Sequence, residues 1–433
     1  TIMSVALALT TLSAYAQTDG DISKSKEWPS MPVLEITTVG GVEPTATLVY
    51  PPEGCVGQGI TSEYVTGKLV MSLNGESIYD SGEYIKGESG VRIKIRGNNS
   101  GAFLQQKPYK LKLSKKADLL EMGKAYKSKD WALLSLSTWN TVMTNEESNI
   151  LPLMGLAVGR VLEQPWIPNI KAVNVMLNGK YKGLYYLIET VERADTRIVT
   201  SKTGFVIEND AYWWKPDEVY FRTNRQHPYM GYTFKYPDTD DMTDAEKNAI
   251  CDYMNTVEEA IFKCDGSAAE FIDYDSFARW ILGHDILGTK DAAGSNMFLY
   301  KDDLDSNAPE SSKLMMGTMW NFDTSFMVGA NEWSTVHSHP VFYYEQLFKD
   351  PLFVKKYLEK YNNYKDKVYE YVEDYFNNLK NVNGEAIKQS MALHKEIYPS
   401  QCKNTLEKQI DESLNFLKSR LKALEEMTKD LET

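Results

Sequence analysis

Apolar and polar positions alternate with a period of two along much of the first half of the chain, which predicts half-buried β-strands. Strands are expected at 33–38, 46–50, 68–73, 91–96, 108–113, 172–177 and 183–188. In the 108–113 segment Tyr109, Leu111 and Leu113 share one face, while two lysines share the other. The last two strands are joined through Asn178-Gly179, which is a strong signal for a tight hairpin.

The second half of the chain changes to a helical spacing of apolar residues. Helices are expected at about 145–160, 244–263 and 274–287, followed by long amphipathic helices over about 351–431. The C-terminal helices are rich in Lys and Glu and should pack one face on the body of the protein. A β-rich front half followed by a helical back half predicts the α+β class.

The first residues have the pattern of a processing signal. A short apolar run over residues 2–9 is followed by Ala14-Tyr15-Ala16, which fits an A-x-A cleavage site. Residues 1–16 are therefore interpreted as a signal-peptide remnant and 17–31 as a polar leader, although a buried N-terminal helix is the alternative. We expect an exported protein, periplasmic or extracellular at the cell surface, with no membrane span.

Charge and cysteine content narrow the functional classes. The chain has 433 residues, with 47 Lys and Arg against 60 Asp and Glu, giving a net charge of -13. An acidic protein is a poor general binder of nucleic acid, although a small basic pocket for one phosphorylated ligand remains compatible. None of the four cysteines forms a C-x-x-C pair; Cys251 and Cys264 could form a disulfide or remain buried free thiols.

Three motifs carry residues suited to phosphate and metal chemistry. The first is the Gly/Asn/Ser turn from Arg96 to Gly101, followed by Lys107 and Lys110 on the next strand. Backbone N–H groups in such a turn and a nearby lysine can meet an anion. A hairpin turn flanked by solvated lysines is the plainer explanation of this motif alone.

The other two motifs contain carboxylate and amide oxygens. Asp291 and Asn296 are five positions apart in a short loop after a predicted helix, and Asn321 and Asp323 follow an apolar run. Phosphoryl transfer needs a carboxylate to orient the attacking group and oxygen ligands for Mg²⁺. Each motif alone could be a capped loop, but an early lysine, a D-x-x-x-x-N loop and a later Asp reproduce the linear order of kinase parts.

The sequence resembles the CotH kinase family, named for spore coat protein H, over about residues 90–330. The resemblance rests on R-G-N-x-S at 96–100, K-P-Y-K-L-K-L at 107–113, D-W-A-L-L at 130–134, V-M-L-N-G-K-Y-K-G-L-Y at 175–185, L-I-E at 187–189, and the segments 291–296 and 320–326. It implies an atypical protein-kinase-like two-lobed fold, ATP and Mg²⁺ or Mn²⁺ as cofactors, and phosphorylation of Ser or Thr on exported proteins.

The resemblance also implies roles for individual residues. It places Asp291 as the catalytic carboxylate, Asn296 and Asp323 as metal ligands with Asn321 beside them, and Lys107 or Lys110, Arg96 and Glu189 on the nucleotide. Two positions depart from the family pattern: Asn321 stands where W-D-x-D would have an acid, and Thr144 stands where an Arg is common. The Asn321 departure favours the alternative of a pseudokinase that serves as a surface binding or assembly module.

The expected organisation is a β-rich extension over 32–90, a kinase-like domain over 91–340 and a helical region over 341–433. A third functional class, a glycan hydrolase with two facing acids, would need Asp291 and Asp323 to supply both. Weaker features are the aromatic segment 212–214, Trp333 with Tyr343 and Tyr344, which could stack on sugar or peptide but are more simply packing residues, and His337 with His339.

Overall fold

The computed structural model describes residues 29–136, 150–292, 294–304, 312–334, 336 and 344–431. The predicted signal-peptide remnant, most of the polar leader, Thr144, His337, His339 and Tyr343 lie outside the described residues. The start of the helix predicted from residue 145 also lies outside them.

The described residues form strands in the first half and long helices in the second, in agreement with the predicted α+β class. The strands are β1 (Val33–Thr38), β2 (Thr47–Val49), β3 (Gly59–Thr61), β4 (Val65–Leu73), β5 (Glu76–Asp80), β6 (Val91–Ile95), β7 (Tyr109–Ala117), β8 (Ser128–Ser135), β9 (Ile170–Leu177), β10 (Lys180–Glu189), β11 (Phe205–Asp210), β12 (Tyr220–Phe221), β13 (Gly231–Tyr236), β14 (Met297–Lys301) and β15 (Met315–Met316). The α-helices are α2 (Asn99–Phe103), α3 (Leu151–Val161), α4 (Asp244–Lys263), α5 (Tyr274–Leu287), α6 (Tyr344–Leu347), α7 (Pro351–Tyr364), α8 (Val368–Ile397) and α9 (Leu406–Met427). Short 3-10 helices are η2 (Val39–Gly41), η3 (Lys124–Tyr126), η4 (Ser267–Glu270) and η5 (Thr428–Leu431).

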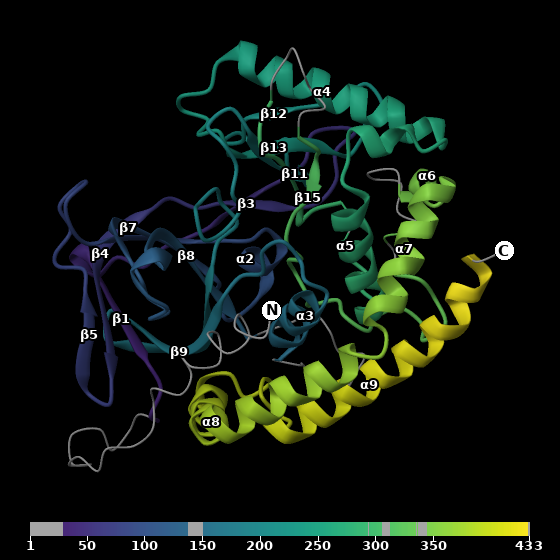
Figure 1. Cartoon of the computed structure of the whole chain (residues 1–433). Helices are drawn as coiled ribbons and strands as arrows, with labels where there is room; N and C mark the ends of the chain where they lie inside the picture. The colour runs from purple at the N-terminus through teal and green to yellow at the C-terminus, as the bar shows by residue number, and fades with distance from the viewer. Residues whose placement is uncertain are drawn as a thin grey trace.

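The first sheet closes on itself as a β-barrel (Figure 1). Its strands follow the order β1, β9, β10, β8, β7, β6 and β4, and β4 pairs again with β1. The β1–β9 pair is parallel and the other pairs are antiparallel. β5 extends the sheet from the far end of β4. Residues 32–90 therefore contribute β1 and β4 to the same barrel as β6–β10, rather than forming a separate extension.

The barrel interior is filled by the apolar members of the alternating strands. Tyr109, Leu111 and Leu113 are buried inside, as the pattern predicts, and large rings such as Trp131 and Tyr185 complete the core. The hairpin between β9 and β10 is also confirmed. Asn178 and Gly179 both have positive φ, 51° and 72°, which is the requirement of a type I′ turn.

A second, five-stranded antiparallel sheet follows the barrel in the chain, with the order β12, β13, β11, β14 and β15. Helix α4 lies on the outer side of this sheet in Figure 1. Its N-terminus has a capping box between Thr243 and Glu246, which explains why the sequence predicted its start correctly. Cys251 lies in this helix and Cys264 directly follows it. The two are 13 residues apart, which corresponds to about 20 Å along the helix axis and is too far for a disulfide. Both are free thiols.

Helix α5 is the central helix of the C-terminal half, and it contacts α3, α7, α9 and β15. Asp273 caps its N-terminus by accepting from the backbone N–H of Ser276, and the helix ends at Gly288, whose φ is 53°. Almost all of its side chains are buried, so its position is fixed from all sides. The loop that follows its end carries Asp291.

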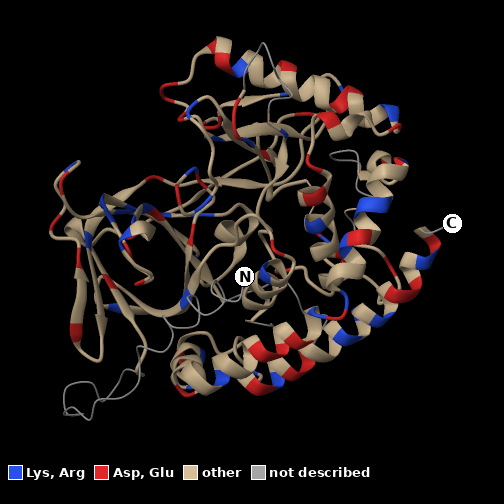
Figure 2. Cartoon of the chain, viewed as in Figure 1, with Lys and Arg blue, Asp and Glu red and all other residues tan. Residues whose placement is uncertain are grey.

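The long helices α8 and α9 wrap around one side of the molecule (Figure 1). Figure 2 shows basic and acidic residues mixed along their exposed faces, while their apolar faces are buried, as the amphipathic pattern predicts. No helix in the described residues is both long and apolar enough to cross a membrane. The structure therefore contains a mixed α+β arrangement with a barrel and C-terminal helices; the kinase-like two-lobed fold stays a prediction.

Arg420 attaches α9 to the centre of the molecule. Its guanidinium donates to the backbone oxygens of Gly329, Ala330 and Glu332 at 2.7–2.9 Å. It also donates to the backbone oxygen of Asp285 in α5, at 2.6 Å. One buried side chain thus joins the last long helix to α5 and to the loop at 329–332.

His394 joins α8 to the barrel. Its Nδ1 accepts from the backbone N–H of Leu184 in β10 at 3.1 Å, and its Nε2 pairs with Gln401 at 2.8 Å. The ring is fully buried. Burial lowers the pKa of His394 from 6.5 to about 4, because the charged form would lose its hydration.

We expect this histidine to make the stability of the fold sensitive to acid. Since its folded-state pKa is depressed, the unfolded chain binds the proton more readily, and stability falls as the pH drops from 6.5 toward 4. Between pH 7.5 and pH 5 the wild type should lose about 2 kcal/mol more than His394→Gln, which keeps an acceptor for Leu184. Urea unfolding of both proteins at the two pH values measures the difference. Equal losses would show that His394 does not carry this effect.

Candidate active site

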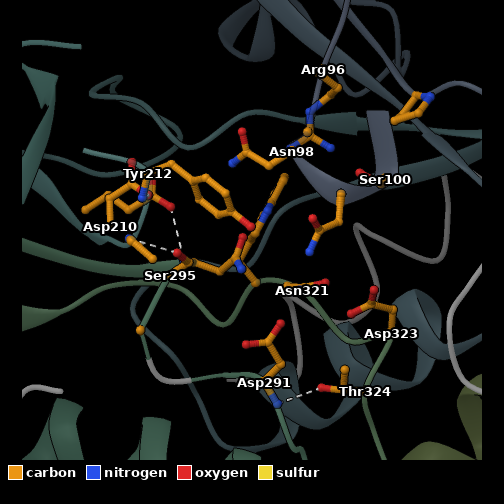
Figure 3. Close-up of a pocket in the computed structure, with 18 of the residues that line it drawn as sticks. Arg96, Asn98, Ser100, Asp210, Tyr212, Asp291, Ser295, Asn321, Asp323 and Thr324 are labelled. Atoms are coloured by element: carbon orange, nitrogen blue, oxygen red, sulfur yellow. Dashed lines mark hydrogen bonds between the residues drawn. The ribbon is translucent and has the colours of Figure 1, made fainter. Parts of the chain in front are cut away.

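A cavity of about 1100 Å³ lies between the barrel and the five-stranded sheet. The barrel side contributes Arg96, Leu134 and Ile188, and the sheet contributes charged residues of β11 and β13. Further parts of the wall come from the loops 291–296 and 320–324. Figure 3 shows Asp291, Asn321 and Asp323 on one side of the cavity and Asp210, Tyr212 and Ser295 on another.

The loop from Asp291 to Asn296 is held by hydrogen bonds to both neighbouring walls. The backbone N–H of Asp291 donates to Thr324 Oγ1 at 2.9 Å, which ties it to the segment containing Asp323. The backbone N–H of Asn296 donates to Glu208 Oε1 at 3.0 Å. Asn296 has a φ of 62°, a left-handed conformation that Asn tolerates better than most residues. The carboxylate of Asp291 is exposed to the cavity, whereas the loop backbone that carries it is fixed.

Asp323 follows β15 and is placed in the same cavity. Burial, and next the nearby charge of Asp291, raise the pKa of Asp323 to about 6. Its Oδ1 atom is buried without a hydrogen-bond partner. A buried carboxylate oxygen with no donor is costly unless a cation or another ligand satisfies it. This atom therefore fits the requirement of a divalent metal ligand.

Helix α3 supports this segment through a close contact at Gly155. A Cβ added at Gly155 would lie 2.0 Å from the ring of Phe322, the residue between Asn321 and Asp323. The ring therefore packs directly on the helix backbone, and any side chain at position 155 would displace it. The two candidate metal ligands are thereby positioned by the contact between α3 and the residue that separates them.

The Arg96 turn forms the barrel side of the cavity. The Arg96 guanidinium lies 5.9 Å from the centre of the Trp320 ring. Burial lowers the pKa of Arg96, and the negative charge of Glu208 opposes this shift. Among the described residues Arg96 has no ion-pair partner. Lys107 supports the turn from behind, because its Nζ donates to the backbone oxygens of Gly101 and Ala102 at 2.9 and 3.0 Å.

The charged residues of β11 and β13 were not among those predicted from the sequence. Lys235 forms an ion pair of 2.8 Å with Glu208, which also accepts from the backbone of Asn296. Burial opposes the charged form of Lys235, but Glu208, Glu218 and Asp210 outweigh it and raise its pKa. Burial and the charge of Glu208 likewise raise the pKa of Asp210. In the sequence, the signal for these charged cavity residues is the presence of charged positions inside the short apolar runs 205–210 and 231–236.

The structure brings together five of the predicted site residues and leaves three elsewhere. Arg96, Asp291, Asn296, Asn321 and Asp323 all line the cavity, whereas Lys107, Lys110 and Glu189 do not. Lys110 lies 3.6 Å from Asp130 on the outer face of the barrel. Glu189 accepts from the backbone and side-chain N–H groups of Asn169 and lies 3.6 Å from Arg197.

The donor set of the cavity is consistent with a metal shared with a phosphate ligand. Within the residues that the structure describes, no three His, Cys, Asp or Glu residues group into a metal site of their own. A kinase-type centre uses one Asp and one Asn, and phosphate oxygens complete the coordination. Asp323, Asn296 and Asn321 carry the Asp and Asn oxygens that such a centre uses.

A comparison with protein families places this chain in a known family. The model of the family described as CotH kinase protein matches residues 93–424. The chain belongs to the CotH kinase family. The CotH match begins in β6 and ends in α9, so it includes the C-terminal helices and excludes β1–β5. No curated protein matches the chain.

We expect Asp323 to lower the stability of the fold at neutral pH. Because its folded-state pKa is raised, the charged carboxylate destabilises the fold at pH 7.5, and this effect disappears as the pH falls below 6 toward 4. Asp323→Asn should therefore raise the free energy of unfolding at pH 7.5 on the order of 1–2 kcal/mol and have little effect near pH 4. Urea unfolding at both pH values measures this, with the exposed Asp217→Asn as a control. A loss of stability in Asp323→Asn at pH 7.5 would contradict the prediction.

Proposed function

We propose that this protein is an exported kinase that transfers the γ-phosphoryl group of ATP to Ser or Thr hydroxyls of extracytoplasmic or surface proteins. Membership of the CotH kinase family supports a kinase-like function. The observation that carries the proposal is the convergence of Asp291, Asn296 and Asp323 on one cavity, with a buried oxygen of Asp323 lacking a partner. The apolar run that ends in Ala14-Tyr15-Ala16 supports the export part of the proposal.

Asp323, Asn296 and Asn321 would hold the metal, Mg²⁺ or Mn²⁺. When bound, the metal would neutralise phosphate charge and fix the orientation of the phosphates. Five carboxyl groups and three Lys or Arg side chains are found among the described lining residues, so the cavity walls carry excess negative charge. Nucleotide binding should therefore depend strongly on the metal.

Arg96 and Lys235 would supply the positive charge that the protein itself offers to the phosphates. Arg96 lines the cavity and has no ion-pair partner among the described residues, so its charge is available for a ligand. Lys235 is held by Glu208, which also accepts from the backbone of Asn296. A lysine–glutamate pair beside a metal-binding Asn has the same parts as the ion pair of protein kinases, although here both members lie on adjacent strands.

Asp291 would orient the acceptor hydroxyl. Its carboxylate is exposed to the cavity while its backbone is tied to Thr324, so the group is accessible and fixed. In the transfer step the hydroxyl oxygen forms the new P–O bond, the bond to ADP breaks, and the hydroxyl proton leaves toward Asp291. An orienting carboxylate acts mainly in the transition state, so it affects turnover more than binding.

A pseudokinase is the second candidate, and Asn321 is the observation that favours it. Asn321 lines the cavity and supplies a neutral oxygen at a position where the resemblance leads us to expect an acid. Such a protein would bind metal and ATP without transferring phosphate. Retention of Asp291, Asn296 and Asp323 favours the active kinase.

We expect two carboxylate variants to separate binding from transfer. Asp323→Ala removes a metal ligand, so metal-dependent ATP affinity should fall about tenfold or more and transfer should be lost. Asp291→Asn should keep affinity within about threefold but lower turnover by about 100-fold or more. Calorimetry with ATP and Mn²⁺, and labelled phosphate transfer to a Ser/Thr-rich peptide, measure the two effects, with Asp217→Asn as the control. Wild type that binds metal and ATP but never transfers would support the pseudokinase, and no binding at any metal concentration would contradict both.

Restoring the acid at position 321 should affect the metal requirement. Asn321→Asp adds a negative charge beside Asp323, so half-maximal transfer should be reached at a metal concentration about threefold lower or more. Asn321→Ser is the matched neutral variant and should require at least as much metal as the wild type. A metal titration of the initial transfer rate compares the three proteins. A higher metal requirement in Asn321→Asp would place this side chain away from the metal.

A further inference from the structure

Tyr212 occupies a position in the cavity that the kinase proposal does not yet use. It follows β11, and Figure 3 shows its ring pointing into the cavity. Its hydroxyl makes no hydrogen bond among the described residues. The ring therefore offers an apolar face and an uncommitted donor to whatever enters the cavity.

Two hydrogen bonds fix the backbone at this residue. The N–H of Tyr212 donates to Asp210 Oδ1 at 2.8 Å, which forms a tight local turn. The N–H of Ala211 donates to Ser295 Oγ at 3.1 Å. Because Ser295 belongs to the loop between Asp291 and Asn296, the position of Tyr212 is tied directly to that of the candidate catalytic loop.

A third contact comes from a distant part of the chain, the loop 50–58 between β2 and β3. A Cβ added at Gly57 would lie 2.9 Å from Cε1 of Tyr212, so the loop backbone packs on the edge of the ring. The loop is itself anchored, because Trp214 Nε1 donates to the backbone oxygen of Val56 at 3.2 Å. Val56 lines the cavity as well. The 50–58 loop thus forms a wall that holds Tyr212 in place.

The charges near Tyr212 indicate which ligand it meets. Burial and then the carboxylates of Asp291 and Asp210 raise the pKa of its hydroxyl, so this side of the cavity is acidic and the phenol stays protonated. Asp291 and Asp210 would repel phosphate groups at this ring, whereas Arg96 on the barrel side of the cavity would attract them. A neutral chain presenting a hydroxyl to Asp291 fits this side. The phenol can donate to a backbone carbonyl of such a chain.

We propose that Tyr212 contacts the acceptor polypeptide and determines which acceptors reach Asp291, and that the 50–58 loop positions its ring. This inference rests on the proposed kinase function. The 50–58 loop precedes the residues matched by the CotH family, so this wall of the cavity is an addition to the family-matched part of the chain. The inference therefore assigns acceptor selection to Tyr212 together with a loop that lies outside the family-matched residues.

Two glycines of the loop provide a matched test. Gly57 and Gly54 have nearly the same φ, 82° and 84°, so an alanine strains the backbone similarly at either position. A Cβ at Gly57 would press on the Tyr212 ring, whereas nothing lies within 4 Å of a Cβ at Gly54. Gly57→Ala should raise the KM for a synthetic Ser/Thr-rich peptide by about tenfold, and Gly54→Ala by less than about twofold.

Substitution of the ring tests the contact itself. Tyr212→Phe should raise the peptide KM about threefold through loss of the hydroxyl, and Tyr212→Ala more than about tenfold. The affinity for ATP with Mn²⁺, measured by calorimetry, should stay within about twofold in every variant. Tyr220→Phe is the control, because this exposed tyrosine packs next to Trp213 but does not line the cavity.

Each outcome has a distinct meaning. A fall in ATP affinity in the Tyr212 variants would assign the ring to the nucleotide and overturn the inference. An unchanged peptide KM, or equal effects of Gly57→Ala and Gly54→Ala, would also overturn it while the kinase proposal stands. Wild type that transfers no phosphate would overturn the proposed function together with this inference.

Discussion

The position of β1 is the constraint on which the rest of the structure depends. This strand pairs with β4 on one edge and with β9 on the other, and it is the link that closes the barrel. Without it, two strand edges would expose unpaired N–H and C=O groups, and the interior around Trp131 and Tyr185 would open to water. A closed barrel is rigid, so the turn between β6 and β7 presents Arg96 in a fixed place. The first strand of the described chain is therefore needed for a cavity whose reactive residues lie mainly after residue 200.

The carboxylates in the cavity lower the stability of the folded protein, and a bound cation would offset their repulsion. Asp291 and Asp323 repel each other, and Glu208 adds to the unfavourable environment of Asp210. Groups of this kind are retained where a cation or substrate compensates the repulsion. Glu208 limits the cost on the sheet side, because it accepts from both Lys235 and the backbone of Asn296. The Glu208 carboxylate thus both pairs with Lys235 and holds the backbone of Asn296.

Local features of the fold could be predicted from the sequence, whereas features that depend on distant contacts could not. The alternation at 109–113, the Asn178-Gly179 turn and the ends of α4 and α5 follow from residue type and spacing, and the structure confirms them. Closure of the barrel joins strands more than 130 residues apart, and no local pattern encodes it. β11 and β13 are short and lie in a polar, aromatic region. The alternation of apolar and polar residues that marks a strand could therefore not be recognised there.

The candidate site shows the same division between local and distant information. Motif order identified Asp291, Asn296 and Asp323 as members of one site, because a motif records residue identity regardless of what lies between. It could not show where a flexible side chain points. Lys107 turns back to the backbone oxygens of α2, and Lys110 faces Asp130 outside the barrel. Tyr212 belonged to an aromatic segment that sequence alone explained as packing. Its contact with Gly57 and the hydrogen bond from the neighbouring Ala211 to Ser295 distinguish it.

The four hydrogen bonds of Arg420 affect the order in which a newly synthesised chain can mature. Synthesis proceeds from the N-terminus, so every strand of the barrel is available once residue 189 has emerged. The loop at 329–332 and the end of α5 must wait for residue 420, because its guanidinium supplies donors to their backbone oxygens. A nascent chain can therefore hold a finished barrel long before the end of α5 and the 329–332 loop are secured. The C-terminal half therefore reaches its final arrangement only when synthesis of the chain is nearly complete.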